Sequence, residues 1–251
     1  AKALSDLNKK MRVGLLLPRI QNPFFTDLIQ GALDAQKALA DYGVEVKLME
    51  MRGYQVEEQL KKIDEIVEQK IDMLALTPFD DSRIAEKINE IVDRGIKVFT
   101  VNSDICDTKR CCYIGTDFEE SGKLAAGLIG LINRKAHVLI LNGSPKLLSQ
   151  AQRIQGFTKK IRERFPEVRV ASTVVCNDND YTAYDLVREE LRSDSEIDLI
   201  YIVGEGICGA CNAIAEFQDR RIDVVCYDEV PHTRDLFEEG KISATICQQA
   251  Y

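Results

Sequence analysis

Strand-like and helix-like segments alternate along almost the whole chain, and this alternation constrains the fold more than any other feature. The strand-like segments are short apolar runs at 13–17, 44–49, 73–76, 98–101, 138–141, 170–175, 199–203, 224–227 and 244–247. The segments between them have the apolar spacing of amphipathic helices, at 56–68, 84–92, 118–132, 151–164 and 183–191. Such alternation is typical of right-handed crossovers that build parallel sheets with helices on both faces. We therefore predict a doubly wound α/β fold.

Two polar stretches interrupt this rhythm and suggest where the chain divides. They are 102–110 (NSDICDTKR) and 228–232 (DEVPH). If both are crossovers, the segments outside them form one lobe and the segment between them forms the other. We expect an N-terminal lobe of residues 11–102 and 232–251 and a C-terminal lobe of residues 103–231. A cleft between two such lobes is a usual place for a small ligand.

Composition excludes several classes of function. The net charge of -8 argues against a nucleic-acid surface on this chain, because phosphate binding needs clustered Lys and Arg. No apolar run approaches the roughly 20 residues that a membrane helix needs. With only His137 and His232 in the chain and no Gly-x-Ser-x-Gly motif, we expect no catalytic residue, no metal and no cofactor.

The cysteines are numerous and lie largely inside apolar strands or at helix starts, where thiols behave as small hydrophobic side chains. They are Cys106, Cys111, Cys112, Cys176, Cys208, Cys211, Cys226 and Cys247. This pattern favours a reducing cytoplasm. Cys208 and Cys211 form a C-x-x-C motif that mimics a thioredoxin-type pair, because a helix start lowers the pKa of the first thiol.

An aromatic pair follows the first strand. The sequence Asn22-Pro23-Phe24-Phe25 opens a helix, with Asn22 as its cap and Pro23 in its first turn. The helix needs only one of the two rings for its apolar face. We expect the other ring to face a ligand at the carboxyl edge of the sheet, although both rings could instead staple the helix to the sheet.

Polar side chains follow several other strands. Asn102, Asp228 and Gln248 each come directly after an apolar run, Asn179 follows another, and Arg153 lies early in the helix after the strand that ends at Asn142. Together they supply hydrogen-bond donors and acceptors around one cavity, which suits a polyhydroxy ligand. Taken one at a time, each residue could equally cap a helix or a turn.

A rival motif points to a different class of protein. Gly204-Glu205-Gly206-Ile207-Cys208-Gly209 spells G-x-G-x-x-G between a strand and a helix, and Asp228 closes the next strand. This pattern is the fingerprint of a dinucleotide site and would make the chain an NAD-dependent enzyme. The motif falls on a late βα unit, however, and no compact catalytic domain follows it.

The chain resembles the effector-binding domain of LacI-family regulators and their relatives, the periplasmic pentose and hexose binding proteins. The matching motifs are Asn22-Pro23-Phe24-Phe25, Leu76-Thr77-Pro78, Tyr113-Ile114-Gly115-Thr116-Asp117, Arg153-x-x-Gly156-Phe157, Tyr227-Asp228 and Ala244-Thr245-Ile246-Cys247-Gln248. The resemblance implies a periplasmic binding protein type I-like fold. It also implies ligand contacts at Asn22, Phe24, Phe25, Arg153, Asp228 and Gln248, with Asn179 where the family often has an aromatic residue.

Two departures from the family pattern concern the ligand. Where relatives commonly have Asp-Arg at the first crossover, this chain has Asn102-Ser103-Asp104, so Asp104 or Arg110 would anchor the ligand there. Where relatives usually have Asn-Asp, Glu205 is the only polar candidate.

We therefore expect the cytoplasmic effector domain of a LacI-type regulator that binds a sugar or polyol without catalysis. Residues 1–10 resemble the end of a hinge. The protein would be a homodimer and would contact operator DNA only through a headpiece outside this chain, with no membrane contact. The alternative is the sugar-binding protein of an ABC transporter, and the NAD-dependent enzyme is a further alternative.

Overall fold

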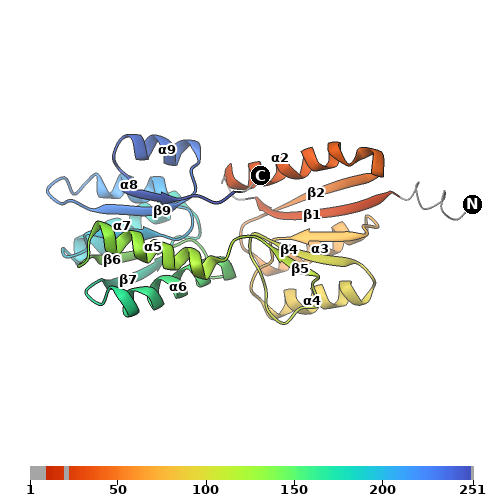
Figure 1. Cartoon of the computed structure of the whole chain (residues 1–251), viewed down its shortest axis with the longest axis horizontal. Helices are drawn as coiled ribbons and strands as arrows, with labels where there is room; N and C mark the ends of the chain where they lie inside the picture. Colours follow the sequence, from red (N-terminus) through yellow and green to blue (C-terminus); the bar gives the residue numbers. More distant parts are fainter. Residues whose placement is uncertain (1–9, 20–22, 250–251) are drawn as a thin grey trace, which may run out of the picture. The chain divides into compact units, whose positions relative to one another are not determined.

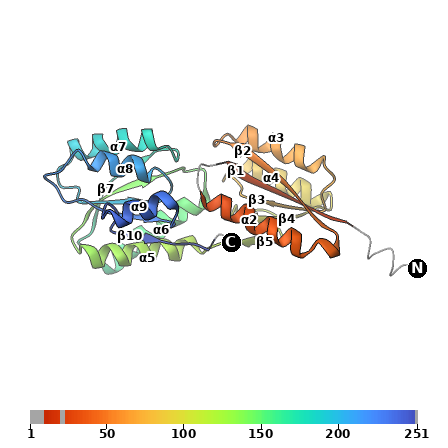
Figure 2. The ribbon, with the colours of Figure 1, turned by 90° about the horizontal axis from the view of Figure 1, so that it is seen from above.

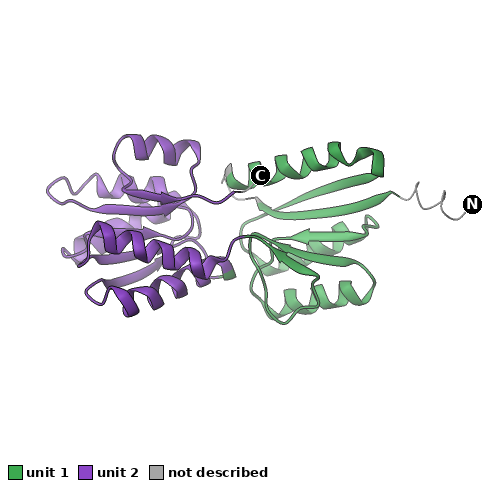
Figure 3. Ribbon diagram, viewed as in Figure 1, with its two compact units in different colours: residues 1–115, 146–148, 250–251 green, residues 116–145, 149–249 purple. Residues whose placement is uncertain are grey.

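The structure of the chain is a computed structural model, which describes residues 10–19 and 23–249. Asn22 and residues 1–9 of the predicted hinge therefore lie outside the described residues. The described chain forms two compact units (Figure 3). Unit 1 contains the described residues up to Gly115 together with Lys146–Leu148, and unit 2 contains Thr116–Pro145 and Ser149–Gln249.

Unit 1 is a parallel sheet whose strands are joined by helices (Figure 1). Its elements are β1 (Met11–Arg19), α2 (Pro23–Ala38), η1 (Ala40–Tyr42), β2 (Val44–Arg52), α3 (Val56–Val67), β3 (Met73–Leu76), α4 (Ser82–Asp93), β4 (Lys97–Val101) and β5 (Cys112–Ile114). The strand order is β2-β1-β3-β4-β5, and the paired strands run parallel.

Alternate side chains of β1 face two different helical layers. Leu16 packs with Ile63 of α3 and Ile88 of α4, whereas Leu15 and Leu17 pack on the side of α2. Figure 1 shows α2 on one face of the sheet and α3 and α4 on the other. Each fully buried leucine contributes about 1.5–3 kcal/mol to folding. The need to fill both faces explains why β1 is a continuous apolar run.

Unit 2 repeats the same plan. Its elements are α5 (Phe118–Ile132), β6 (His137–Asn142), α6 (Leu148–Arg164), β7 (Arg169–Val175), α7 (Asp180–Ser193), β8 (Leu199–Ile202), α8 (Ile207–Ile214), β9 (Asp223–Tyr227), α9 (Pro231–Glu238) and β10 (Ala244–Ile246). The strand order is β10-β9-β8-β6-β7, again with parallel pairings.

Two apolar clusters cover the faces of the unit 2 sheet. Ile140 and Tyr201 pack with Phe157 of α6 and other residues of α5 and α6. Leu139 packs with Val187 of α7 and residues of α8 on the opposite face. Figure 2 shows α7 and α8 on one side of this sheet and α5 on the other. Both units are thus doubly wound, which confirms the predicted fold class.

The strand orders locate a switch point in each sheet. In unit 2 the chain leaves β6 toward β7 on one side and later enters β8 on the other side of β6. In unit 1 the same reversal occurs between β1 and β3. In open α/β sheets, ligands bind outside the carboxyl ends of the strands at such a point.

The unit boundaries differ from those expected from the sequence. The predicted N-terminal lobe of 11–102 and 232–251 ends before β5, but β5 pairs with β4 in the unit 1 sheet. The predicted lobe also included 232–251, but β10 pairs with β9 in the unit 2 sheet, and α9 also belongs to unit 2. The predicted C-terminal lobe of 103–231 therefore starts too early and ends too soon relative to unit 2. The limits of the two units are set by which strands pair through backbone hydrogen bonds. The hydrophobic periodicity of the sequence does not show that pairing.

Candidate functional site

Arg153 is buried near the carboxyl edge of the unit 2 sheet. Only 6% of its surface is exposed, and its Nη1 donates a hydrogen bond to the carbonyl oxygen of Val203 over 2.8 Å. The guanidinium carbon lies 3.6 Å from the centroid of the Tyr227 ring and 4.8 Å from that of Phe118. Its Nε has no partner among the described residues. Arg153 is therefore a rigidly packed cation with a donor to spare, as a ligand-binding arginine requires.

Asp228 and Gln248 are joined beside it. Gln248 Nε2 donates to Asp228 Oδ2 over 3.0 Å and to Oδ1 over 3.2 Å. Asp228 follows β9 with φ 65, in the left-handed region, and its amide donates to the carbonyl oxygen of Ile246. Burial raises the pKa of Asp228, and Arg153 and Gln248 act in the opposite direction. The structure thus brings three sequence-predicted residues, Arg153, Asp228 and Gln248, to one edge of one sheet.

Glu205 lies at the same edge, after β8. Its amide donates to Asp178 Oδ1 over 2.8 Å. Burial raises the pKa of Asp178 to about 6. Burial is also the main cause that raises the pKa of Glu205 to about 8, and the charges of Asp178 and Asp228 add to it. Within residues 10–19 and 23–249, no donor is hydrogen-bonded to the Glu205 carboxyl group.

Two glycines at the switch point leave room for this arrangement. A side chain on Gly143, after β6, would overlap the carboxylate of Asp178. A Cβ on Gly204, after β8, would lie 2.5 Å from Asp178 Oδ1 and 2.7 Å from Gln150 Nε2. Gln150 Oε1 in turn accepts a hydrogen bond from the amide of Ser144 over 2.7 Å. The carboxylate of Asp178 therefore packs directly on the backbone between β6 and β8.

Asn142 is a site candidate that the sequence analysis did not select. It is the last residue of β6, only 6% of its surface is exposed, and its Oδ1 has no hydrogen-bond partner in the part of the chain that the structure describes. A buried polar atom without a partner costs about 1–3 kcal/mol, so it invites a ligand or water. A polar residue that closes an apolar strand was the signal in the sequence.

Asn179 has a local structural role. Its side chain accepts a hydrogen bond from the amide of Thr182 over 3.0 Å and caps α7. Its surface is exposed. A ligand contact for Asn179 stays a prediction.

In unit 1, Asp104 is tied into its own loop. Thr100 Oγ1 donates to Asp104 Oδ1 over 2.7 Å, and the Arg110 guanidinium forms an ion pair with the same carboxylate. Asn102 follows β4 with φ 62 and donates its amide to the carbonyl oxygen of Ile114. These residues lie after the carboxyl end of β4, as expected, and their contact with a ligand stays a prediction.

Phe24 and Phe25 are both buried. Phe24 has 9% and Phe25 has 6% of its surface exposed, and the two rings meet edge to face with centroids 5.5 Å apart. They pack with Leu15 and Leu17 of β1. The sequence led us to expect one free ring, but in the described chain both rings fasten α2 to the sheet. A ligand contact through either ring edge stays a prediction.

A comparison with known protein families identifies the family of this chain. A family profile described as a periplasmic binding protein domain matches residues 13–251. The chain belongs to the periplasmic binding protein domain family.

Related proteins of known name agree with the family. The ribose import binding protein RbsB of Bacillus subtilis (strain 168) is 25% identical over 253 residues, which cover 99% of this chain and 80% of that protein. The D-allose-binding periplasmic protein of Escherichia coli (strain K12) is 21% identical over 245 residues, or 93% of this chain and 78% of that protein. A solved structure described as the XylFII molecule has a TM-score of 0.86 at 26% identity and covers 96% of this chain and 89% of that one.

The matching profile is described as a periplasmic binding protein domain and not as a LacI-type effector domain, which we expected first from the sequence. The two named relatives, from Bacillus subtilis and Escherichia coli, carry the names of sugar-binding proteins, and neither is named as a regulator. The expected periplasmic binding protein type I-like fold is confirmed by this match and by the structural similarity.

The glycines of 204–209 serve packing in this periplasmic binding protein domain. Gly206 begins α8 with φ 99, and a side chain on Gly209 would overlap the carbonyl group of Asp180 in α7. The half-buried Glu205 carboxyl group stands at the start of α8, where a dinucleotide would place its pyrophosphate. That side chain brings no positive charge to the phosphate position, and the glycines already have a packing role, so the arrangement disfavours the NAD-dependent alternative.

The C-x-x-C motif also differs from a redox pair. We expected the start of α8 to lower the pKa of Cys208, but burial raises it. Burial likewise raises the pKa of Cys211 to about 12. Because the thiolate is the reactive form, these shifts act against the reactivity of a thioredoxin-type pair.

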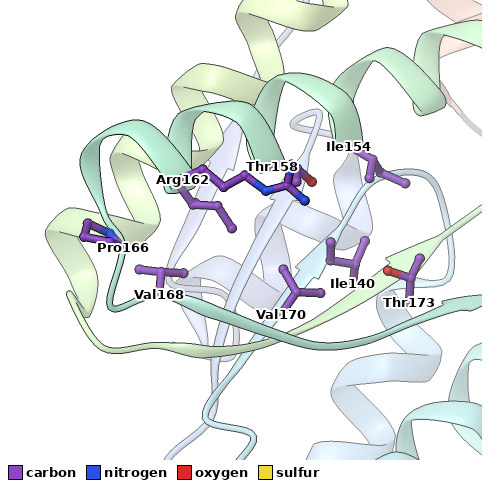
Figure 4. Close-up of a pocket in the computed structure, with 9 residues that line it drawn as sticks. Ile140, Ile154, Thr158, Arg162, Pro166, Val168, Val170 and Thr173 are labelled. Carbon is purple, nitrogen blue, oxygen red and sulfur yellow. The ribbon is translucent and has the colours of Figure 1, made fainter.

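A separate pocket of about 550 Å³ opens between α6 and the strands β6 and β7 (Figure 4). Ile154 and Thr158 of α6 face Ile140 and Val170 across it, with Arg162 at one side. None of the predicted site residues lines it.

No helix among the described residues is long and apolar enough to cross a membrane.

Proposed function

We propose that the protein is the sugar-binding component of an importer, which binds a monosaccharide or similar polyol and catalyses no reaction. The observation that carries this proposal is the set of the buried Arg153 with the half-buried Asp228 and Gln248 at the carboxyl edge of the unit 2 sheet. The names of the related ribose and D-allose binding proteins support the substrate class.

The chemistry of the set suits hydroxyl groups. A hydroxyl donates one hydrogen bond and accepts up to two, so its site needs both donors and acceptors. Arg153 offers its free Nε as a donor, and Asp228 offers carboxylate oxygens as acceptors. Because packing on Phe118 and Tyr227 fixes the guanidinium, little entropy is lost when the ligand binds. Asn22, Phe24, Phe25, Asn102 and Asp104 of the N-terminal part are proposed as further contacts.

One observation favours a second candidate function. All cysteines in the chain lie in the described residues and are unpaired, including the exposed Cys106, Cys111, Cys112 and Cys247. Free exposed thiols are typical of the cytoplasm, where a homodimeric LacI-type effector domain with a DNA-binding headpiece would work. The importer component would instead lie outside the cytoplasm.

A thermal-shift assay tests the proposed function. The protein is heated alone and with members of a sugar panel that includes ribose, xylose, allose and galactose, with NAD as a comparison. A ligand at 100 times its Kd adds about 2.7 kcal/mol to the free energy of unfolding. We expect at least one sugar to raise the Tm and NAD to leave it unchanged. Stabilisation by NAD and by no sugar would refute the proposal.

Fractionation of native cells separates the two candidates. The importer component should be recovered outside the cytoplasm, and recovery in the cytosol together with DNA would favour the regulator instead. Alkylation of the native protein before and after reduction reports the thiols independently. A fully reduced set would count for the cytoplasm.

A further inference from the structure

Acidic groups dominate the carboxyl edge of the unit 2 sheet. Glu205 and Asp228 approach Arg153 closely enough for its charge to act on both. Asp178 and Asp180 add like charges that act on Glu205. Arg153 is already engaged by the Val203 carbonyl oxygen. With a neutral ligand these carboxyl groups either stay protonated or ionise without a counter-charge, which is costly for partly buried groups.

The buried Asn142 side chain independently indicates that this edge lacks a hydrogen-bond donor. The strand register pairs Leu141 with Ile202, so Asn142 comes beside Val203, whose carbonyl oxygen binds Arg153. Side-chain alternation along β6 places Asn142 on the sheet face of Ile140, where α6 and Arg153 also lie. Its Oδ1 is an acceptor with no donor among the described residues. The edge therefore has an acceptor without a donor and more carboxyl groups than cationic groups.

An ammonium group would supply both the donor and the positive charge, because it is a cation that donates as many as three hydrogen bonds. Resting on the proposed function, we infer that the ligand is a polyhydroxy compound with a protonated amine, such as an amino sugar, and that Glu205 receives its ammonium group. Arg153, Asp228 and Gln248 then bind the hydroxyl groups. Glu205 thereby determines the specificity for amino over neutral sugars.

The protonation state of Glu205 provides a second readout. Its pKa is raised to about 8 by burial and by Asp178, Asp228 and Asp180, with Arg153 opposing them, so the free protein holds this proton at pH 7. An ammonium ion stabilises the carboxylate and lowers that pKa. Binding of a protonated amino sugar at pH 7 should therefore be accompanied by a net release of protons.

Calorimetric titration of the full chain tests the inference with matched ligand pairs. The probes are glucosamine, galactosamine and mannosamine, each paired with its neutral parent sugar, in two buffers of different ionisation enthalpy at pH 7. We expect at least one amine to bind about 10-fold more tightly than its parent and to release a proton. Equal or tighter binding of the neutral parent would overturn the inference and leave the proposed function standing. If neither amines nor any neutral sugar binds, the proposed function itself fails.

A conservative variant assigns the effect to Glu205. Glu205→Gln keeps the size of the side chain but removes its ability to become negatively charged. We expect it to weaken amine binding about 10-fold or more and to change neutral-sugar binding by less than about 3-fold. The matched control is Asp185→Asn, which removes an exposed carboxylate of α7 in the same unit and should change neither. An unchanged amine affinity in Glu205→Gln would overturn the assignment, and if that variant does not fold, the wild-type proton release still decides.

Discussion

Replacing Arg153 by alanine should weaken both the fold of unit 2 and ligand binding. The change leaves the buried carbonyl oxygen of Val203 without its 2.8 Å donor, at a cost of about 1–3 kcal/mol. It also removes the guanidinium that lies 3.6 Å from the Tyr227 ring centroid, worth about 0.5–2 kcal/mol. The unpaired Nε disappears at the same time, which offsets part of the loss. We expect a net loss of about 2–4 kcal/mol in the free energy of unfolding of unit 2.

Denaturant and thermal unfolding followed by circular dichroism measure this loss. For a protein of this size, 2–4 kcal/mol corresponds to a Tm lowered by roughly 4–16 °C. The matched control is Arg162→Ala, an exposed arginine on the same helix, which should stay within about 0.5 kcal/mol of wild type. Because the chain has two units, the two transitions are fitted separately.

The binding loss is measured at a temperature where the variant is folded. Removal of a buried charged partner costs about 2–5 kcal/mol of binding free energy, or roughly 30-fold to several thousand-fold in Kd. A stability change below about 0.5 kcal/mol would refute the packing argument for Arg153. An unchanged sugar affinity would remove Arg153 from the site.

Three further changes test the packing and charge of unit 2. Gly204→Ala places a methyl group 2.5 Å from the Asp178 carboxylate and should cost about 1–3 kcal/mol in chemical unfolding, whereas Gly127→Ala, in open space on α5, should be neutral or stabilising. The pKa of Asp178 is raised from 3.8 to about 6 in the folded protein, so the folded state holds that proton more tightly than the unfolded state. The free energy of unfolding therefore falls as the pH rises from about 4 to 6. Asp178→Asn should flatten the dependence of the free energy of unfolding on pH in this range and stabilise the protein at pH 7.5 by about 2–3 kcal/mol. Tyr201→Phe removes the buried hydroxyl that is hydrogen-bonded to Tyr227 over 2.8 Å and should lower the free energy of unfolding by about 1 kcal/mol, and a more stable variant would contradict that bond.

The strongly periodic elements could be predicted from the sequence. The helix expected at 118–132 is α5 (Phe118–Ile132), and the strand expected at 170–175 is β7 (Arg169–Val175). A very short element was not predicted. β5 is only three residues long, so it has no periodic pattern to detect. This is also why the predicted lobe boundaries differ from the unit boundaries.

The residues of the candidate site could likewise be predicted only in part. Polar residues that follow apolar strands are visible in the sequence, and they led to Arg153, Asp228 and Gln248. The pairing of Asp178 with Glu205 was not visible, because it joins residues 27 positions apart and depends on a left-handed backbone at Asp178. The burial of Phe24 and Phe25 likewise depends on what covers them.

The sequence by itself determined the parallel, doubly wound architecture of this protein, because hydrophobic periodicity is a local property that each helix and strand carries along its own length. Only the tertiary structure decided which polar groups face one another and which of them hold a proton. These properties depend on distances and burial between residues far apart in the chain, as the effect of Asp178, Asp228 and Arg153 on the carboxyl group of Glu205 illustrates.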